Sequence, residues 1–251
     1  MKINFIRNLI KGKSIGSKVV LGRVACVGKD VFKIKAKDEH TKLINMQKAR
    51  FDLLLDWING EITPKSEVIE NHLYRKDILP FIKQQEKLQW FSLNSNIDYL
   101  LFDSYAEFTD QKFQHREEGW SFCCHYTDLL HTDEFNRTFE NCGLLPLNIL
   151  ENTYSSFFDW VESNYPNKLM IFIHYSARFD DRKEFKDREK EINIIIKNES
   201  MKRPNLLNLY LDEQYYLRPK NDDYPYHYSK KTYKCLVKKW NDLESIKNIY
   251  N

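Results

Sequence analysis

The sequence has little of several things that mark special classes of protein. It contains only 7 Gly and 7 Pro among 251 residues, which argues against collagen-like chains and long flexible linkers. No apolar run approaches the length that crosses a bilayer, so an integral membrane segment is not expected. Neither sign of charge is in excess, because 39 Lys and Arg face 36 Asp and Glu, and dedicated nucleic-acid binding is therefore not expected.

Cysteine is also sparse, and its spacing is irregular. The five cysteines are Cys26, Cys123, Cys124, Cys142 and Cys235. An odd number without regular spacing does not indicate a disulfide framework, so reduced thiols and a cytoplasmic location are expected. Residues 1–17 are interpreted as an N-terminal extension and not as a signal peptide, because Arg7 and Lys11 interrupt the apolar residues.

The composition, with 42% hydrophobic and 30% charged residues, is typical of a folded protein, and we expect a single domain over residues 1–251. Short apolar runs predict strands at 18–22, 43–46, 97–103, 168–175 and 206–210. Helical spacing follows at 50–59, 66–91 (interrupted by Pro80), 147–164, 180–200 and 229–248. This alternation predicts an α/β fold, a three-layer sandwich with a mostly parallel sheet of about five strands. Residues 104–146 are expected to form an irregular insertion of loops and short helices.

Parallel sheets place their ligand sites at the carboxyl ends of the strands. That rule selects the loop after Leu21, the segment at Arg50, the segment at Asp103 and Ser104, and the late loop that holds His227. These places supply the candidate site residues.

His227 is the strongest single candidate. An imidazole that titrates near neutral pH can take a proton from a nucleophile and return it to a leaving group. Either Asp222 or Asp223 can orient such a ring. The alternative is a surface histidine in a polar, tyrosine-rich loop.

Cys26 follows the first predicted strand and precedes Gly28, in a segment expected to be a loop. A thiol activated there by a base, by Lys29 or by a helix N-terminus would be a nucleophile. The alternative is a buried cysteine that packs as a small hydrophobic residue. The amides around Gly28 and Lys29 can bind an oxyanion or a phosphate if they open a helix.

Two further groups have both a functional and a structural interpretation. Arg50 can clamp a carboxylate or phosphate, or it can form a salt bridge with Asp52 or Glu107. Asp103 and Glu107 can tune each other's pKa, or one can cap the next helix.

A zinc site is not expected. The candidate ligands would be Cys123, Cys124, His125, His131 and Cys142. Adjacent cysteines without a C-x2-C spacing rarely ligate one tetrahedral ion.

The selected places resemble the SGNH/GDSL hydrolase superfamily, and more narrowly a family of uncharacterised SGNH-type proteins found with bacterial capsule and surface-polysaccharide genes. Residues 24–32, 48–50, 98–107 and 224–229 carry this resemblance, the last reading Tyr-Pro-Tyr-His-Tyr-Ser. The resemblance implies an SGNH/flavodoxin-like fold. It also implies acyl-ester hydrolysis or transfer by a serine nucleophile after the first strand and a histidine near the C-terminus.

The chain departs from the superfamily pattern at the nucleophile. Ala25 stands where the superfamily has its serine, and Tyr224 stands three residues before the histidine, where an acid is usual. The nucleophile is then Cys26 or another serine. Gly28 and Ser104 lie nearest the implied oxyanion.

Three functions stay open. The first is an esterase or O-acyltransferase that acts on a bacterial surface polysaccharide or its precursor, with a carbohydrate or acylated small molecule as substrate. A hydrolase of this kind would need no cofactor, whereas a transferase would use an acyl donor such as acetyl-CoA. The second is an inactive module that binds a glycan or nucleotide-sugar. The third is phosphate or nucleotide chemistry at Gly28 and Lys29.

Overall fold

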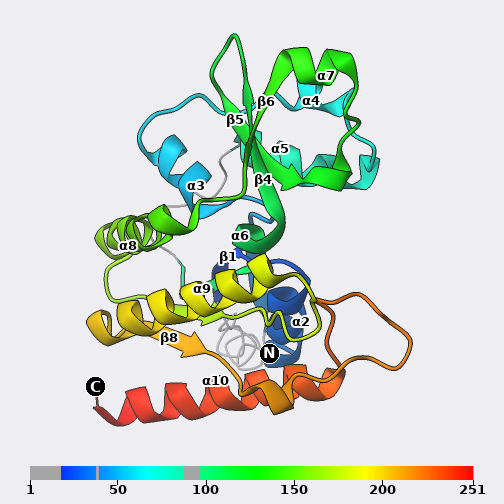
Figure 1. The fold of residues 1–251 in the computed structure, drawn as a ribbon. Coiled ribbons are helices and arrows are strands. Elements are labelled where there is room, and N and C mark those ends of the chain that lie inside the picture. The colour runs from blue at the N-terminus through cyan, green and yellow to red at the C-terminus, as the bar shows by residue number, and fades with distance from the viewer. Residues whose placement is uncertain (1–17, 38–39, 88–96, 251) are drawn as a thin grey trace, which may run out of the picture.

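The structure, a computed structural model, describes residues 18–37, 40–87 and 97–250 (Figure 1). The expected N-terminal extension, residues 1–17, lies outside the described residues. The main body of the molecule is an α/β sandwich around a five-stranded sheet in the order β2-β1-β3-β7-β8.

Every pairing in this sheet is parallel. Its strands are β1 (Lys18–Arg23), β2 (Thr41–Asn45), β3 (Tyr99–Asp103), β7 (Leu169–Ile173) and β8 (Leu206–Leu209). The central strands are nearly continuous apolar runs because helices cover both of their faces. The predicted α/β class and parallel sheet are confirmed, and the strand order is that of flavodoxin-like folds.

Helices form the two outer layers. On one side, α2 (Cys26–Lys35) packs against α10 (Lys230–Tyr250), and on the other α8 (Leu147–Asn164) packs against α3 (Phe51–Ile58) and α9 (Lys183–Lys202). Figure 1 shows β8 between α9 and α10. Aromatic rings fill the space under α3 and α8, where Phe51 stacks on Phe157 with ring centroids 4.1 Å apart. Among the described residues, none of these helices has the length and apolarity needed to cross a bilayer.

Residues 104–146 contain the short helices that were expected, but the expectation of an otherwise irregular insertion is wrong. This segment holds a second, antiparallel sheet in the order β5-β4-β6. Its elements are α6 (Tyr105–Thr109), β4 (Asp110–His115), β5 (Ser121–His125), η2 (Tyr126–Asp128), α7 (Asp133–Thr138) and β6 (Phe139–Gly143). Gly119, with φ of 79°, lies in the turn between β4 and β5 and supplies the left-handed conformation that glycine adopts freely.

This small sheet has a core of its own. Phe113 and Phe122 lie opposite each other in register, with stacked rings 5.4 Å apart. Three short helices cover them: α4 (Ser66–Glu70), η1 (Lys76–Ile78) and α5 (Leu79–Lys87). Pro80 does not interrupt α5, because it lies in the first turn, where the missing N–H is not needed.

A helix, not a loop, follows the first strand, so the loop expected through Cys26 and Lys29 is wrong. The helix α2 begins at Cys26 and buries Val27 and Val31 one turn apart. Gly28 is required for close packing here, because a Cβ at this position would lie 2.5 Å from the Val24 Cβ and 2.8 Å from the Asp103 carboxylate.

Candidate active site

The candidate site lies at the carboxyl ends of the parallel strands. β1 has β2 on one side and β3 on the other, so the chain leaves β1 in one direction and later returns to the opposite side. Such a reversal is the usual ligand site of an open α/β sheet. Cys26 is the first residue of α2 and follows β1 directly at this point.

The thiol of Cys26 is held by a buried tyrosine. Its Sγ lies 3.0 Å from the Tyr175 hydroxyl, and the Val27 amide donates to the same hydroxyl over 3.1 Å. Tyr175 follows β7 and is fully buried, and burial raises its pKa well above the usual range. The phenol therefore keeps its proton and is the donor whenever Cys26 carries a negative charge.

His227 joins the same group from the far end of the chain. The pKa of His227 is raised to about 9, and the largest cause is its interaction with the Cys26 side chain. Partial burial lowers this pKa, whereas the hydrogen bond with Asp222 raises it further. The Nδ1 atom of His227 lies 2.5 Å from the Asp222 carboxylate. The described residues thus bring a thiol, an imidazole and a carboxylate to one edge of the sheet, and these are the kinds of side chain that a Cys-His-Asp triad uses.

The structure distinguishes Asp222 from Asp223, between which the sequence did not decide as the partner of His227. Asp222 binds His227, and its carboxylate also accepts the Tyr224 amide over 2.9 Å, which fixes the turn. Asp223 is fully exposed, and its ion pair is with Arg218, 3.9 Å away. Asp222 is therefore the residue that can orient the imidazole.

Asp103 and Ser104 support the site from beneath. Asp103 is buried, and its two oxygens accept the amides of Ala25 (2.7 Å) and Tyr105 (3.2 Å). Burial raises the pKa of this carboxyl to about 7. Ser104, also buried, accepts the Tyr175 amide through its hydroxyl over 2.9 Å. These two candidates position the backbone around Cys26 and Tyr175 and do not face a substrate.

Gly28 and Lys29 lie in the first turn of α2. The first amides of a helix have no partner within the helix, so those of Cys26 and Gly28 are available as donors beside the thiol. Lys29 donates to the Gln47 side chain, which follows β2, over 2.8 Å.

Arg50 does not belong to this site. Its guanidinium is buried and forms a bidentate pair with Asp52, with Nη2 2.5 Å from the carboxylate. It also donates to the carbonyl oxygens of Gly143 (2.6 Å) and Asp110 (3.3 Å). All three nitrogens are used, so Arg50 ties the antiparallel sheet to the start of α3 and is not free to bind a ligand.

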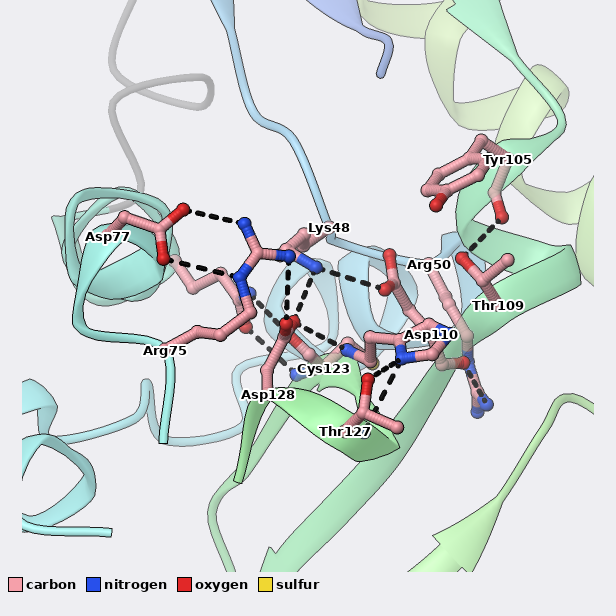
Figure 2. A network of polar contacts seen from close by, with 12 residues as sticks. Lys48, Arg50, Arg75, Asp77, Tyr105, Thr109, Asp110, Cys123, Thr127 and Asp128 are labelled. Atoms are coloured by element: carbon pink, nitrogen blue, oxygen red, sulfur yellow. Dashed lines mark hydrogen bonds and ion pairs between the residues drawn. The ribbon is translucent and has the colours of Figure 1, made fainter. Parts of the chain in front are cut away.

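A second charged network lies next to Arg50 (Figure 2). Lys48, in the loop after β2, lies 2.7 Å from the Asp128 carboxylate and 3.5 Å from that of Asp110. Arg75 pairs with Asp77 at 2.6 Å and with Asp128 at 3.4 Å. These contacts join the antiparallel sheet and its helices to the loop after β2, so they fix the two sheets together.

The cysteine and histidine residues of the antiparallel sheet do not assemble into a metal site. Cys123 and Cys124 are buried neighbours on one strand, so their side chains point to opposite faces. Within residues 18–37, 40–87 and 97–250, no three His, Cys, Asp or Glu side chains are grouped so that they could hold a metal ion.

Tyr175 is the site residue that sequence reasoning missed. The apolar run through residues 168–175 reads as one continuous strand, whereas β7 ends at Ile173. The signal was present, because a polar side chain directly after a buried parallel strand falls at the edge where sites form. His174, on the same segment, instead bonds to Asn208 at 2.8 Å.

The raised pKa of His227 can be tested directly. We expect its imidazole to titrate near pH 9 in the native protein and closer to the ordinary 6.5 in Cys26→Ala, measured by two-dimensional NMR of the ring nitrogens. Because the folded-state pKa is raised, the stabilisation from this group is complete below pH 6.5 and is lost as the pH rises through about 9. Titration at the same pH in both proteins would show that Cys26 and His227 do not interact.

No protein-family model matches this chain, and no curated protein matches it. The site is therefore interpreted from its own geometry.

Proposed function

We propose that this protein is a thiol-dependent acyl-ester hydrolase or O-acyltransferase, with Cys26 as nucleophile, His227 as general base and acid, and Asp222 as the residue that orients His227. The observation that carries the proposal is the hydrogen bond of His227 with Asp222 at the carboxyl edge of the sheet, together with the electrostatic interaction of His227 with Cys26. An imidazole between a thiol and a carboxylate is suited to proton transfer during acyl chemistry.

The reaction follows in two halves. His227 takes the proton of the Cys26 thiol, and the sulfur attacks the acyl carbon of the ester. The C–O bond then breaks, His227 returns the proton to the departing alcohol, and the acyl group remains on sulfur as a thioester. In the second half, water or an acceptor hydroxyl gives its proton to His227 and attacks the thioester carbon. The C–S bond then breaks, and His227 returns the proton to sulfur, which restores the Cys26 thiol.

Charge that develops on the acyl oxygen is stabilised by the start of α2. The amides of Cys26 and Gly28 lie in the first turn of α2, where amides have no partner within the helix, and the helix N-terminus carries partial positive charge. Tyr175 is a positioning residue in this scheme, because its hydroxyl holds Sγ and the Val27 amide together. Hydrogen-bond donors fixed before the reaction are an effective source of transition-state stabilisation.

The resemblance to SGNH hydrolases supports acyl chemistry with a shifted nucleophile. Ala25, at the superfamily's serine position, has its amide bound to Asp103, and the reactive side chain is one residue later at Cys26. We propose an acylated carbohydrate, such as a bacterial surface polysaccharide or its precursor, as substrate. Tyr224 is 41% exposed and its ring lies 4.7 Å from that of His227, so it can pack on a sugar ring. The five cysteines are free thiols, which agrees with the proposed cytoplasmic location.

Alkylation kinetics test the proposal. We expect iodoacetamide to modify Cys26 faster than Cys142, the most exposed cysteine, as followed by peptide mass spectrometry. The physical reason is that His227 can accept the thiol proton, whereas burial raises the pKa of Cys142. His227→Ala should abolish the advantage of Cys26. Equal modification of the two cysteines, together with no hydrolysis of p-nitrophenyl acetate, would leave an inactive binding module as the better interpretation.

A further inference from the structure

Lys29 is a half-buried ammonium group that has no carboxylate partner among the described residues. Its Nζ donates to the neutral Gln47 side chain over 2.8 Å and lies 5.3 Å from the centre of the Phe81 ring. The other lysines described on α2 are neutralised, since Lys33 pairs with Asp30 (3.0 Å) and Lys35 with Glu244 (2.7 Å). In the described part of the chain, Lys29 forms no ion pair with a carboxylate.

The position of Lys29 relative to the nucleophile is fixed by the helix. It lies three residues after Cys26, and side chains at that spacing share one face with Cβ atoms about 5–6 Å apart. Its ammonium interacts electrostatically with Cys26, and partial burial lowers its pKa from the ordinary value. A half-buried cation without a counter-ion is costly, and a bound anion would offset that cost.

We infer that the substrate carries a carboxylate or phosphate group a few bonds from the reacting acyl carbon, and that Lys29 binds this group. The inference rests on the proposed function, because it takes Cys26 as the point of attack. The geometry behind it is the juxtaposition of an unpaired ammonium and the nucleophilic sulfur on one face of α2.

Two reagents of nearly equal size separate this role from a general effect on the thiol. Iodoacetate is an anion and iodoacetamide is neutral, and both transfer a carbon to the Cys26 sulfur with release of iodide. Any change in the fraction of thiolate affects both rates equally and cancels in their ratio. The ratio of the two second-order rates at Cys26 therefore measures attraction of the anion alone.

We expect Lys29→Met to lower the iodoacetate-to-iodoacetamide ratio by about five-fold, the effect of one unit charge a few ångströms away in water. Lys29→Arg should keep the wild-type ratio, and high salt should reduce that ratio more in the wild type than in Lys29→Met. The matched control is Lys33→Met, one turn further along α2, which should lower the ratio much less because Lys33 lies farther from Cys26 and is exposed.

The outcomes distinguish the two proposals. Rapid labelling of Cys26 by both reagents with a ratio that Lys29→Met does not change would overturn the inference and leave the proposed function standing. If Cys26 reacts no faster than Cys142 with either reagent, the proposed function fails and the anion site fails with it.

Discussion

Replacing His227 with alanine is expected to lower kcat/KM toward p-nitrophenyl acetate by about 10³-fold, because the side chain transfers a proton in both halves of the proposed reaction. Asp222→Asn should also lower kcat, since the amide cannot stabilise the charged imidazolium. Stopped-flow or steady-state release of p-nitrophenol measures both effects. Circular dichroism of each variant establishes that it is folded.

Asp223→Asn is the matched control for Asp222→Asn. The two acids are neighbours, but Asp223 is fully exposed and pairs with Arg218, whereas Asp222 bonds to His227. Activity should therefore be nearly unchanged in Asp223→Asn. Wild-type activity in His227→Ala, or equal losses in the two aspartate variants, would be incompatible with the proposed triad.

The second large effect concerns stability, at the buried ion pair between Arg23 and Glu107. Their side chains are 1% and 0% exposed, and the Nη1–Oε2 distance is 2.8 Å. Glu107 also accepts the Phe51 amide over 3.1 Å, and the guanidinium lies over the Phe51 ring. Arg23→Met leaves the Glu107 carboxylate buried without its cation, and we expect the free energy of unfolding to fall by about 3–5 kcal/mol in urea denaturation.

Two further variants test whether this loss of stability comes from the unpaired Glu107 carboxylate. The double variant Arg23→Met with Glu107→Gln should recover part of the loss, because no ionised group is then left unpaired. Arg116→Met, which removes an exposed pair with Glu140, should cost less than about 1 kcal/mol. The expectation fails if Arg23→Met lowers the free energy of unfolding no more than Arg116→Met does. The Glu107 carboxyl would then be readily neutralised or hydrated.

The parallel sheet was predictable because its strands are buried on both faces. β1, β3 and β7 therefore read as short apolar runs in the sequence. The limits of α8 were also predicted, since Pro146 precedes its first residue and Pro166 follows its last turn.

The antiparallel sheet was missed for the opposite reason. β4 (DQKFQH) and β6 (FENCG) contain few apolar residues, and their stability comes from aromatic contacts between distant segments. Phe113, for example, stacks on Phe122 of the neighbouring strand. Contacts of this kind depend on the tertiary fold, and local spacing does not reveal them.

The candidate site was predictable only where the strand-end rule applies. That rule predicted that the segments of Cys26 and His227 meet at the same edge, and the electrostatic interaction of His227 with Cys26 agrees with this. It left the choice between Asp222 and Asp223 open, because a turn stabilised by the Tyr224 amide decides which carboxylate meets the imidazole. Arg50 sits at a strand end too, yet its partners Asp52 and Gly143 show that position alone does not make a ligand site.

The distance in sequence between Cys26 and its partners has a consequence for biosynthesis. The thiol emerges from the ribosome early, whereas His227 and Asp222 are added only after β8 and most of the other elements are complete. A growing chain therefore carries an unassisted cysteine until the last loop packs against α2. Under the proposed function, arrested or prematurely released chains that stop short of that loop are expected to lack esterase activity, because their Cys26 has only the reactivity of an ordinary thiol.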